Sequence, residues 1–110
     1  MNEFFDSELV RETMNELEEM QSKLLMHIFD IPYYSNNEKK EYLQLMRDFL
    51  EKQKVLLFRM SLSDDPEAQS TKNRVLESAR LFGLREDQNM EDFFKMLENP
   101  IKELEKSLEP

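Results

Sequence analysis

Residues 35–62, SNNEKKEYLQLMRDFLEKQKVLLFRMSL, decide the fold of this chain. Ser35 is followed three residues later by Glu38, and this pair is a capping box that predicts a helix starting at about Asn36. Apolar residues then recur every three or four positions, as one face of a helix requires. The main stripe comprises Tyr42, Leu43, Met46, Phe49, Leu50, Gln53, Leu56, Leu57 and Met60, with Gln53 its one polar member.

The second half of this helix is apolar on more than one side. Val55, Phe58 and Leu62 project away from the main stripe when successive residues turn by about 100°. A helix of this kind is buried on more than one face, either inside its own bundle or at a subunit contact. We therefore predict a homodimer, with these three residues as contact candidates.

An earlier helix is predicted from about residue 7 to about residue 29. Asp6 is its expected N-cap, which places Phe5 and Val10 as the two members of a hydrophobic staple. The staple leaves Phe4 unexplained, so Phe4 either folds back onto the bundle or reaches another chain as a candidate partner contact. Pro32 is expected to stop the helix, and residues 31–35 to form a short connection. The inward stripe comprises Val10, Met14, Leu17, Met20, Leu24 and Ile28.

A third helix is predicted over about residues 66–82. Pro66 is favoured in a first turn, and Gly83, the only glycine, is expected at the C′ position in the left-handed conformation. Small residues leave the inward stripe of this helix thin. The stripe comprises Ala68, Lys72, Val75, Ala79 and Phe82.

A last helix is predicted to start near Gln88 or Asn89. Phe93 and Phe94 point inward in this pattern, but the methionines that flank them also make them candidates for an adaptable contact surface. Pro100 is expected to kink or restart the helix, and the tail after about Ser107 is expected to fray.

The predicted fold is all-α and bundle-like: a single helical domain over residues 1–110, built on a long antiparallel helical hairpin with two shorter helices packed on it or on a partner chain. One glycine and four prolines leave little turn chemistry for strands, and the commonest residue types are good helix formers. The absence of cysteine fits a reducing cytoplasm. No apolar run is long enough to span a bilayer, so no membrane partner is expected.

Composition also narrows the function classes. A net charge of −9 repels phosphate backbones, so direct nucleic-acid binding is not expected. The single His27 has Leu24 three residues before it, which excludes the Glu-x-x-His pattern of di-metal bundles. One glycine leaves no phosphate-cradling loop, and the acidic pairs read as a solvated helix face. We expect no enzyme activity, no cofactor and no metal site.

Charge is unevenly distributed along the chain. Residues 1–30 carry eight acidic and two basic side chains, a net of −6, whereas residues 31–62 carry six basic and four acidic ones, a net of +2. Lys40, Arg47 and Lys54 recur every seven residues and form a basic row on one side of the central helix. This row either pairs with the acidic first helix across the hairpin or meets an acidic partner protein, and the sequence leaves both open.

Two functions follow from these surfaces. The first is a non-enzymatic protein-interaction or regulatory module that uses its apolar surface and acidic face. The alternative is an acidic inhibitor that occupies the basic nucleic-acid-binding surface of a partner protein. This alternative depends on an acidic row in the first helix, which comprises Glu8, Glu12, Glu16 and Glu19.

Three segments carry a family resemblance: FFDSELV at 4–10, LSDDPEAQ at 62–69 and LFGLREDQ at 81–88. The chain resembles a small uncharacterised family found chiefly in cyanobacteria, whose members are known as a domain of unknown function. The resemblance covers nearly the whole chain, except the tail after Pro100. It implies a photosynthetic bacterium, or a phage that infects one, as the source, and it implies no activity, cofactor or catalytic residue.

Overall fold

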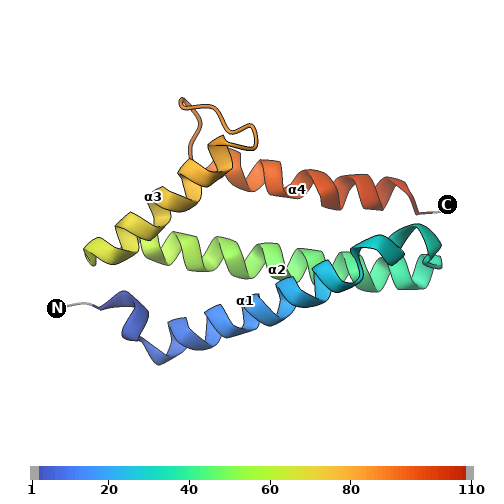
Figure 1. The fold of residues 1–110 in the computed structure, drawn as a ribbon, viewed down its shortest axis with the longest axis horizontal. Helices are drawn as coiled ribbons and strands as arrows, with labels where there is room; N and C mark the ends of the chain where they lie inside the picture. The colour runs from blue at the N-terminus through green and yellow to red at the C-terminus, as the bar shows by residue number, and fades with distance from the viewer. Residues whose placement is uncertain (1–2, 109–110) are drawn as a thin grey trace.

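The computed structural model describes residues 3–108, in which helices are present and strands are not. This confirms the predicted all-α fold. The helices, drawn in Figure 1, are η1 (Phe4–Asp6), α1 (Glu8–Met26), η2 (Ile28–Tyr33), α2 (Asn36–Leu62), α3 (Pro66–Arg80) and α4 (Met90–Lys106), where η denotes a 3-10 helix.

Helix α2 is the centre of the molecule. Helices α1 and α2 run in opposite directions and form the predicted hairpin, and α4 runs along the other side of α2 (Figure 1). Helix α3 packs obliquely against the end of α2 from which it emerges. The result is flat, with extents of 51 × 34 × 20 Å, because α1, α2 and α4 lie side by side and do not close around a common axis.

The core consists of two clusters at opposite ends of α2. The α3-end cluster comprises Val10, Leu56, Leu57, Met60 and Ala68. The η2-end cluster comprises Tyr42, Leu43, Leu50, Ile101 and Leu104. Since α2 supplies members of both clusters, its predicted stripe is what joins the two ends of the molecule. Every buried residue of α2 belongs to that stripe.

Helices α2, α3 and α4 start at or next to the predicted positions, each with a side-chain cap. The capping box of Ser35 and Glu38 is formed in both directions, and Asn89 caps α4. Asp65 caps α3 with its side chain, directly before Pro66. The prediction for α1 was wrong by one residue: Ser7 is the N-cap and accepts a hydrogen bond from the Val10 amide at 3.4 Å. Asp6 instead belongs to η1.

The connection between α1 and α2 is more ordered than predicted. Helix α1 ends at Met26, three residues early, and residues 28–33 form η2 with Pro32 inside it. Proline has no N–H to donate, so Pro32 contributes no backbone hydrogen bond to the winding of this segment. Met14 and Ile28, both on the predicted inward stripe, remain exposed.

Gly83 ends α3 as predicted. Its φ is +118°, and the Leu84 amide donates to the Ala79 carbonyl at 3.1 Å while the Gly83 amide donates to the Arg80 carbonyl at 3.4 Å. These two bonds are those of a Schellman motif with Gly83 at C′, and they bury Leu84 against the bundle. Phe82, in contrast, was wrongly placed on the inward stripe, since it is exposed.

Helix α4 continues through Pro100 without the predicted restart, and it ends at Lys106. The flanking residues compensate for the missing amide, because Ile101 and Leu104 bury their side chains in the η2-end cluster. Leu108, in the tail that was expected to fray, packs partly against the same cluster. The last two positions of that tail, 109 and 110, lie outside the described residues.

Candidate protein-interaction surfaces

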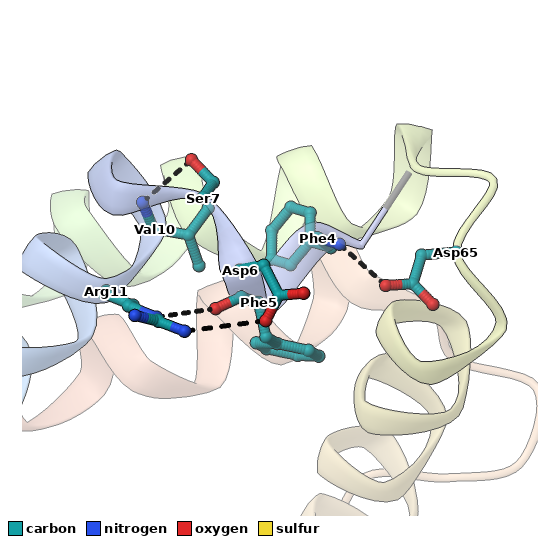
Figure 2. A network of polar contacts seen from close by, with 7 residues as sticks. All are labelled: Phe4, Phe5, Asp6, Ser7, Val10, Arg11 and Asp65. Atoms are coloured by element: carbon teal, nitrogen blue, oxygen red, sulfur yellow. Dashed lines mark hydrogen bonds and ion pairs between the residues drawn. The ribbon is translucent and has the colours of Figure 1, made fainter. Parts of the chain in front are cut away.

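Phe4 is part of an anchor that fastens η1 to the bundle. Its backbone amide donates to Oδ2 of Asp65 at 2.7 Å, and its ring meets the Phe5 ring edge to face at a centroid distance of 5.1 Å (Figure 2). Both rings are partly buried against the α3-end cluster. Phe4 therefore folds back onto the bundle as an intramolecular anchor, which is the first of the two roles predicted for it.

Arg11 completes this anchor from the first turns of α1. Its Nε donates to the Phe5 carbonyl at 3.3 Å, and its guanidinium lies 3.6 Å from the Asp6 carboxylate (Figure 2). Asp6 also raises the pKa of Glu3, first by hydrogen bonding to it and then by charge repulsion. The segment before α1 is thus held by its backbone amide, by two aromatic rings and by one arginine.

The basic row of α2 faces α4, and not the acidic first helix. Arg47 lies 2.6 Å from Glu105, and Lys54 lies 3.3 Å from Glu98 with its ammonium 5.8 Å from the Phe94 ring centroid. Lys40 is exposed, and no carboxylate among residues 3–108 pairs with it. Two members of the row are therefore engaged inside the chain. The α1–α2 pair comes from a residue outside the row, Lys52, which lies 2.5 Å from Glu16.

The acidic row of α1 remains largely open. Glu16 is the member that pairs with Lys52. Glu8, Glu12 and Glu19 are exposed, and none of them has an ion-pair partner within the described part of the chain. The row therefore presents three uncompensated carboxylates along one side of α1.

Phe93 and Phe94 lie inside the bundle. Their rings are 6.0 Å apart and tilted by 33°, and both pack partly buried against the α3-end cluster. Their predicted inward direction is thus confirmed, while their role as partner contacts stays a prediction.

The outward side of α2 keeps the apolar residues that its main stripe does not use. Val55 is 42% exposed, Phe58 62% and Leu62 69%. Burying apolar area of this kind releases roughly 25 cal/mol per Å², so three such side chains on one line favour contact with another surface. Leu9 of α1, also exposed, lines a hollow of about 410 Å³ together with Arg59 and Ser63 near the end of this line.

A second apolar surface, at η2, was missed by sequence reasoning. Phe29 and Tyr33 are each 87% exposed, and Leu25, Met26 and Ile28 are exposed beside them. The sequence signal for this surface is the dense apolar run LLMHIF at 24–29. It places apolar residues on more sides of a helix than one buried face needs. Assigning these residues to the end of the first helix, with Leu24 and Ile28 on its inward stripe, hid this signal.

An apolar groove adjoins these residues, between η2, α2 and α4. It encloses about 380 Å³, and most of its wall is hydrocarbon. Its lining residues are Ile28, Ile31, Pro32, Lys39, Tyr42, Met46, Pro100, Glu103, Leu104 and Ser107. We call this site the η2 groove. At its polar edge, Lys39 donates to the Ser107 carbonyl at 3.3 Å, and Glu103 pairs with Lys106.

A larger hollow of about 520 Å³ lies between α1 and α3, lined by Phe5, Arg11, Met14, Asn15, Glu67 and Thr71. It is the more polar of the two sites, and Arg11 and Phe5 already serve the anchor beside it. The η2 groove is therefore the better candidate, because exposed aromatic side chains adjoin it.

The titratable groups of residues 3–108 form no metal-binding cluster. The ring of His27 lies 3.2 Å from the Asp30 carboxylate, and both side chains are about half exposed. Within these residues, no three His, Cys, Asp or Glu side chains are placed to share a metal ion. Nor does any helix of this region combine the length and the apolar character that crossing a bilayer demands.

Comparison with known proteins identifies the family. No curated protein and no solved structure matches the chain. A family profile described as a domain of unknown function (DUF1825) matches residues 2–104. The matched range takes in the η1 anchor, the buried members of both core clusters and every lining residue of the η2 groove except Ser107. The chain therefore belongs to the DUF1825 family of uncharacterised domains.

Proposed function

We propose that this protein is a non-enzymatic protein-interaction module that binds a partner protein through the η2 groove. The observation that carries the proposal is the exposure of Phe29 and Tyr33, two aromatic residues that directly follow the groove residues Ile28 and Pro32 in the chain. Aromatic side chains bury the largest areas in protein interfaces and are enriched there. A chain gains nothing in its own stability from rings held in water.

The groove suits a partner segment that carries two or three neighbouring large apolar side chains. Its volume of about 380 Å³ has room for such side chains, and its walls offer isoleucine, proline and leucine with one adaptable methionine, Met46. The polar edge at Lys39 and Glu103 would remain at the rim, where charges contribute little to affinity. An amphipathic helix laid between η2 and α4 would meet these requirements.

The test compares proteins captured from a lysate of the source cells by two matched variants. Phe29→Ser with Tyr33→Ser removes the two rings beside the groove, and Leu81→Ser with Phe82→Ser removes two equally exposed residues elsewhere, each 83% exposed. A partner retained by the wild type and by the second variant, but lost from the first, is expected. If both variants retain the same proteins, the groove is not the binding site.

The acidic inhibitor remains the second candidate. The observation in its favour is that Glu8, Glu12 and Glu19 stay unpaired within residues 3–108. Raising the salt from about 50 mM to about 500 mM shortens the Debye length several-fold, so a complex held by this row should dissociate. Capture through the η2 groove should persist instead. Replacing the three glutamates by glutamine must also abolish binding for this candidate to stand.

A cyanobacterial source and a cytoplasmic location belong to the same proposal. They are supported by the resemblance and by the absence of cysteine from the sequence. Purification of the partner from cyanobacterial cytoplasm would test both at once.

A further inference from the structure

We propose that the exposed side of α2 binds an amphipathic helix of a partner protein, and that this helix carries an acidic and a basic side chain seven or eight residues apart. The contact centres on four exposed apolar side chains close to Arg59, which we call the outward patch. The outward patch comprises Val55, Phe58 and Leu62 of α2 and Leu9 of α1.

The shape of the outward patch suits a helix. Val55 and Leu62 are seven residues apart, so the patch extends over about 10 Å, or two turns of α2. Because α1, α2 and α4 lie side by side (Figure 1), the exposed side of α2 is open along its length. A second helix laid along it presents large side chains at intervals of three and four residues over the same two turns. The hollow of about 410 Å³ that Leu9 and Arg59 line receives one of these side chains.

Two charges of opposite sign flank the outward patch without a partner. Residues 50–62 carry four charged side chains, of which Lys52 and Lys54 each pair with a glutamate of α1 or α4. Glu51 and Arg59 are exposed, and the side chain of neither makes an ion pair or a hydrogen bond within the described part of the chain. The charges that this half of α2 leaves unused therefore lie beside its unused apolar residues.

These two charges determine which helix fits. Glu51 and Arg59 are eight residues apart, about 12 Å along the axis of α2, and both lie on the same side of the helix as Val55. The occupant must place a cation near Glu51 and an anion near Arg59 at a matching separation. A uniformly basic helix is repelled at Arg59, and a uniformly acidic one is repelled at Glu51. A helix without charges desolvates both residues and leaves them unpaired, which is costly.

A second copy of the chain does not provide this pattern on the same face. Toward its N-terminal end, the exposed side of α2 is acidic, with Glu41, Asp48 and Glu51. Pairing Glu51 of each copy with Arg59 of the other would lay the outward patch of one copy over the acidic part of the other. The apolar contacts would then be lost, so the occupant is a different protein.

This docking site is separate from the η2 groove. No residue of the outward patch lines that groove. The two sites can therefore be tested independently, and either proposal can fail alone.

Selection from a phage-displayed library of random helical peptides, each of about 18 residues or five turns, tests the inference on the full chain. Peptides are selected on the wild type and counter-selected on Phe58→Ser, which should fold normally because Phe58 is exposed. The surviving peptides are expected to be amphipathic, with an acid and a base seven or eight residues apart. They should still bind Phe29→Ser with Tyr33→Ser, which changes residues next to the η2 groove and none in the outward patch.

Exchanging the two charges of the protein provides the matched control. Glu51→Arg alone and Arg59→Glu alone should each weaken a peptide selected on the wild type about five- to tenfold, as measured by fluorescence anisotropy. The double variant should instead select peptides in which the acid and the base have changed places relative to the apolar residues. The proposal is overturned if no selected peptide depends on Phe58, or if the selected charges do not follow those of the protein. A wild type that sediments as a dimer, beside a monomeric Phe58→Ser, would assign the outward patch to a second copy and would also overturn it.

Discussion

Tyr42 is the buried polar residue that links α1 to α2. Its hydroxyl donates to the Leu24 carbonyl at 2.5 Å, and its ring meets Tyr34 at a centroid distance of 6.2 Å. Burial, with a smaller contribution from Tyr34, raises the pKa of Tyr42. The folded state therefore favours the protonated hydroxyl, which is the form that can donate this hydrogen bond.

The raised pKa gives the Tyr42 contribution a defined pH dependence. A tyrosine whose pKa is higher in the folded state stabilises fully below its unfolded pKa, near 10, and loses this contribution as the pH rises through the folded value. We expect Tyr42→Phe to lower the free energy of unfolding by about 1 kcal/mol at pH 7. The gap between wild type and variant should narrow above about pH 10. Urea unfolding at pH 7 and above about pH 10 measures this difference in the free energy of unfolding. Tyr33→Phe, at an exposed ring, is the control.

The carboxylate of Asp65 has two structural roles. Oδ1 accepts from the Glu67 amide at 2.9 Å and caps α3, while Oδ2 accepts from the Phe4 amide at 2.7 Å. Removing a cap costs about 1 kcal/mol, and the orphaned Phe4 amide adds a similar penalty. Asp65→Ala should therefore lower the free energy of unfolding by about 2 kcal/mol.

Two variants separate the roles of Asp65. Asp65→Ser keeps one acceptor oxygen for the cap and should recover about half of the loss. Asp64→Ala changes an exposed neighbour that makes no hydrogen bond within residues 3–108 and should be nearly neutral. A loss for Asp64→Ala as large as that for Asp65→Ala would remove the special role of Asp65.

At the scale of helices, starts were easier to predict than ends. Ser35, Asp65 and Asn89 cap α2, α3 and α4. The oxygens of their short side chains accept hydrogen bonds from amides two or three residues ahead, which is a purely local interaction. The end of α1 is different, because the tight winding of η2 depends on packing of Ile31 and Tyr34 against residues of α2 and α4. Gly83 was predictable as an end because its conformation is again local.

The candidate site was predictable only in part, for a similar reason. Spacing placed Lys40, Arg47 and Lys54 on one side of α2, but spacing says nothing about which neighbour that side meets. The structure supplies α4, whose Glu98 and Glu105 recur with the same seven-residue interval. That Val55, Phe58 and Leu62 lie away from the main stripe could be predicted, because it depends only on their angle to the stripe, whereas their exposure depends on which neighbours pack there. The η2 groove could not, since its walls come from three separate segments.

Pro100 provides a test at the scale of α4. The helix continues through it, yet proline cannot donate to the Met96 carbonyl and its ring crowds the preceding turn. Pro100→Ala should therefore raise the free energy of unfolding by about 1 to 3 kcal/mol. Asn99→Ala, also exposed, gains only helix propensity and should add less than about 0.7 kcal/mol. Thermal unfolding followed by circular dichroism compares them, and a destabilised Pro100→Ala would show that the proline is required by packing.

At the scale of the whole molecule, α2 is the element on which both core clusters depend. The clusters lie toward opposite ends of a flat bundle (Figure 1), and α1 and α4 are separated by α2. An ordinary globular core is contiguous, so loss of one part weakens the rest directly. Here α2 is the one helix with buried members in both clusters, while α1 and α4 add partly buried side chains that also connect the two ends.

The tyrosines allow the coupling between the two core clusters to be measured. Tyr33, Tyr34 and Tyr42 all lie at the η2 end and the sequence has no tryptophan, so intrinsic fluorescence reports this end alone. Leu57→Ala opens a cavity in the opposite, α3-end cluster and should cost about 2 to 5 kcal/mol. If α2 unfolds as one unit, the urea midpoints from fluorescence and from circular dichroism should fall together. Leu43→Ala, at the η2 end, should likewise lower the fluorescence and circular dichroism midpoints together. The contrary result is a Leu57→Ala variant whose fluorescence midpoint stays at the wild-type value while its circular dichroism curve has two steps. The two ends would then unfold independently, and α2 would break between Leu50 and Leu56.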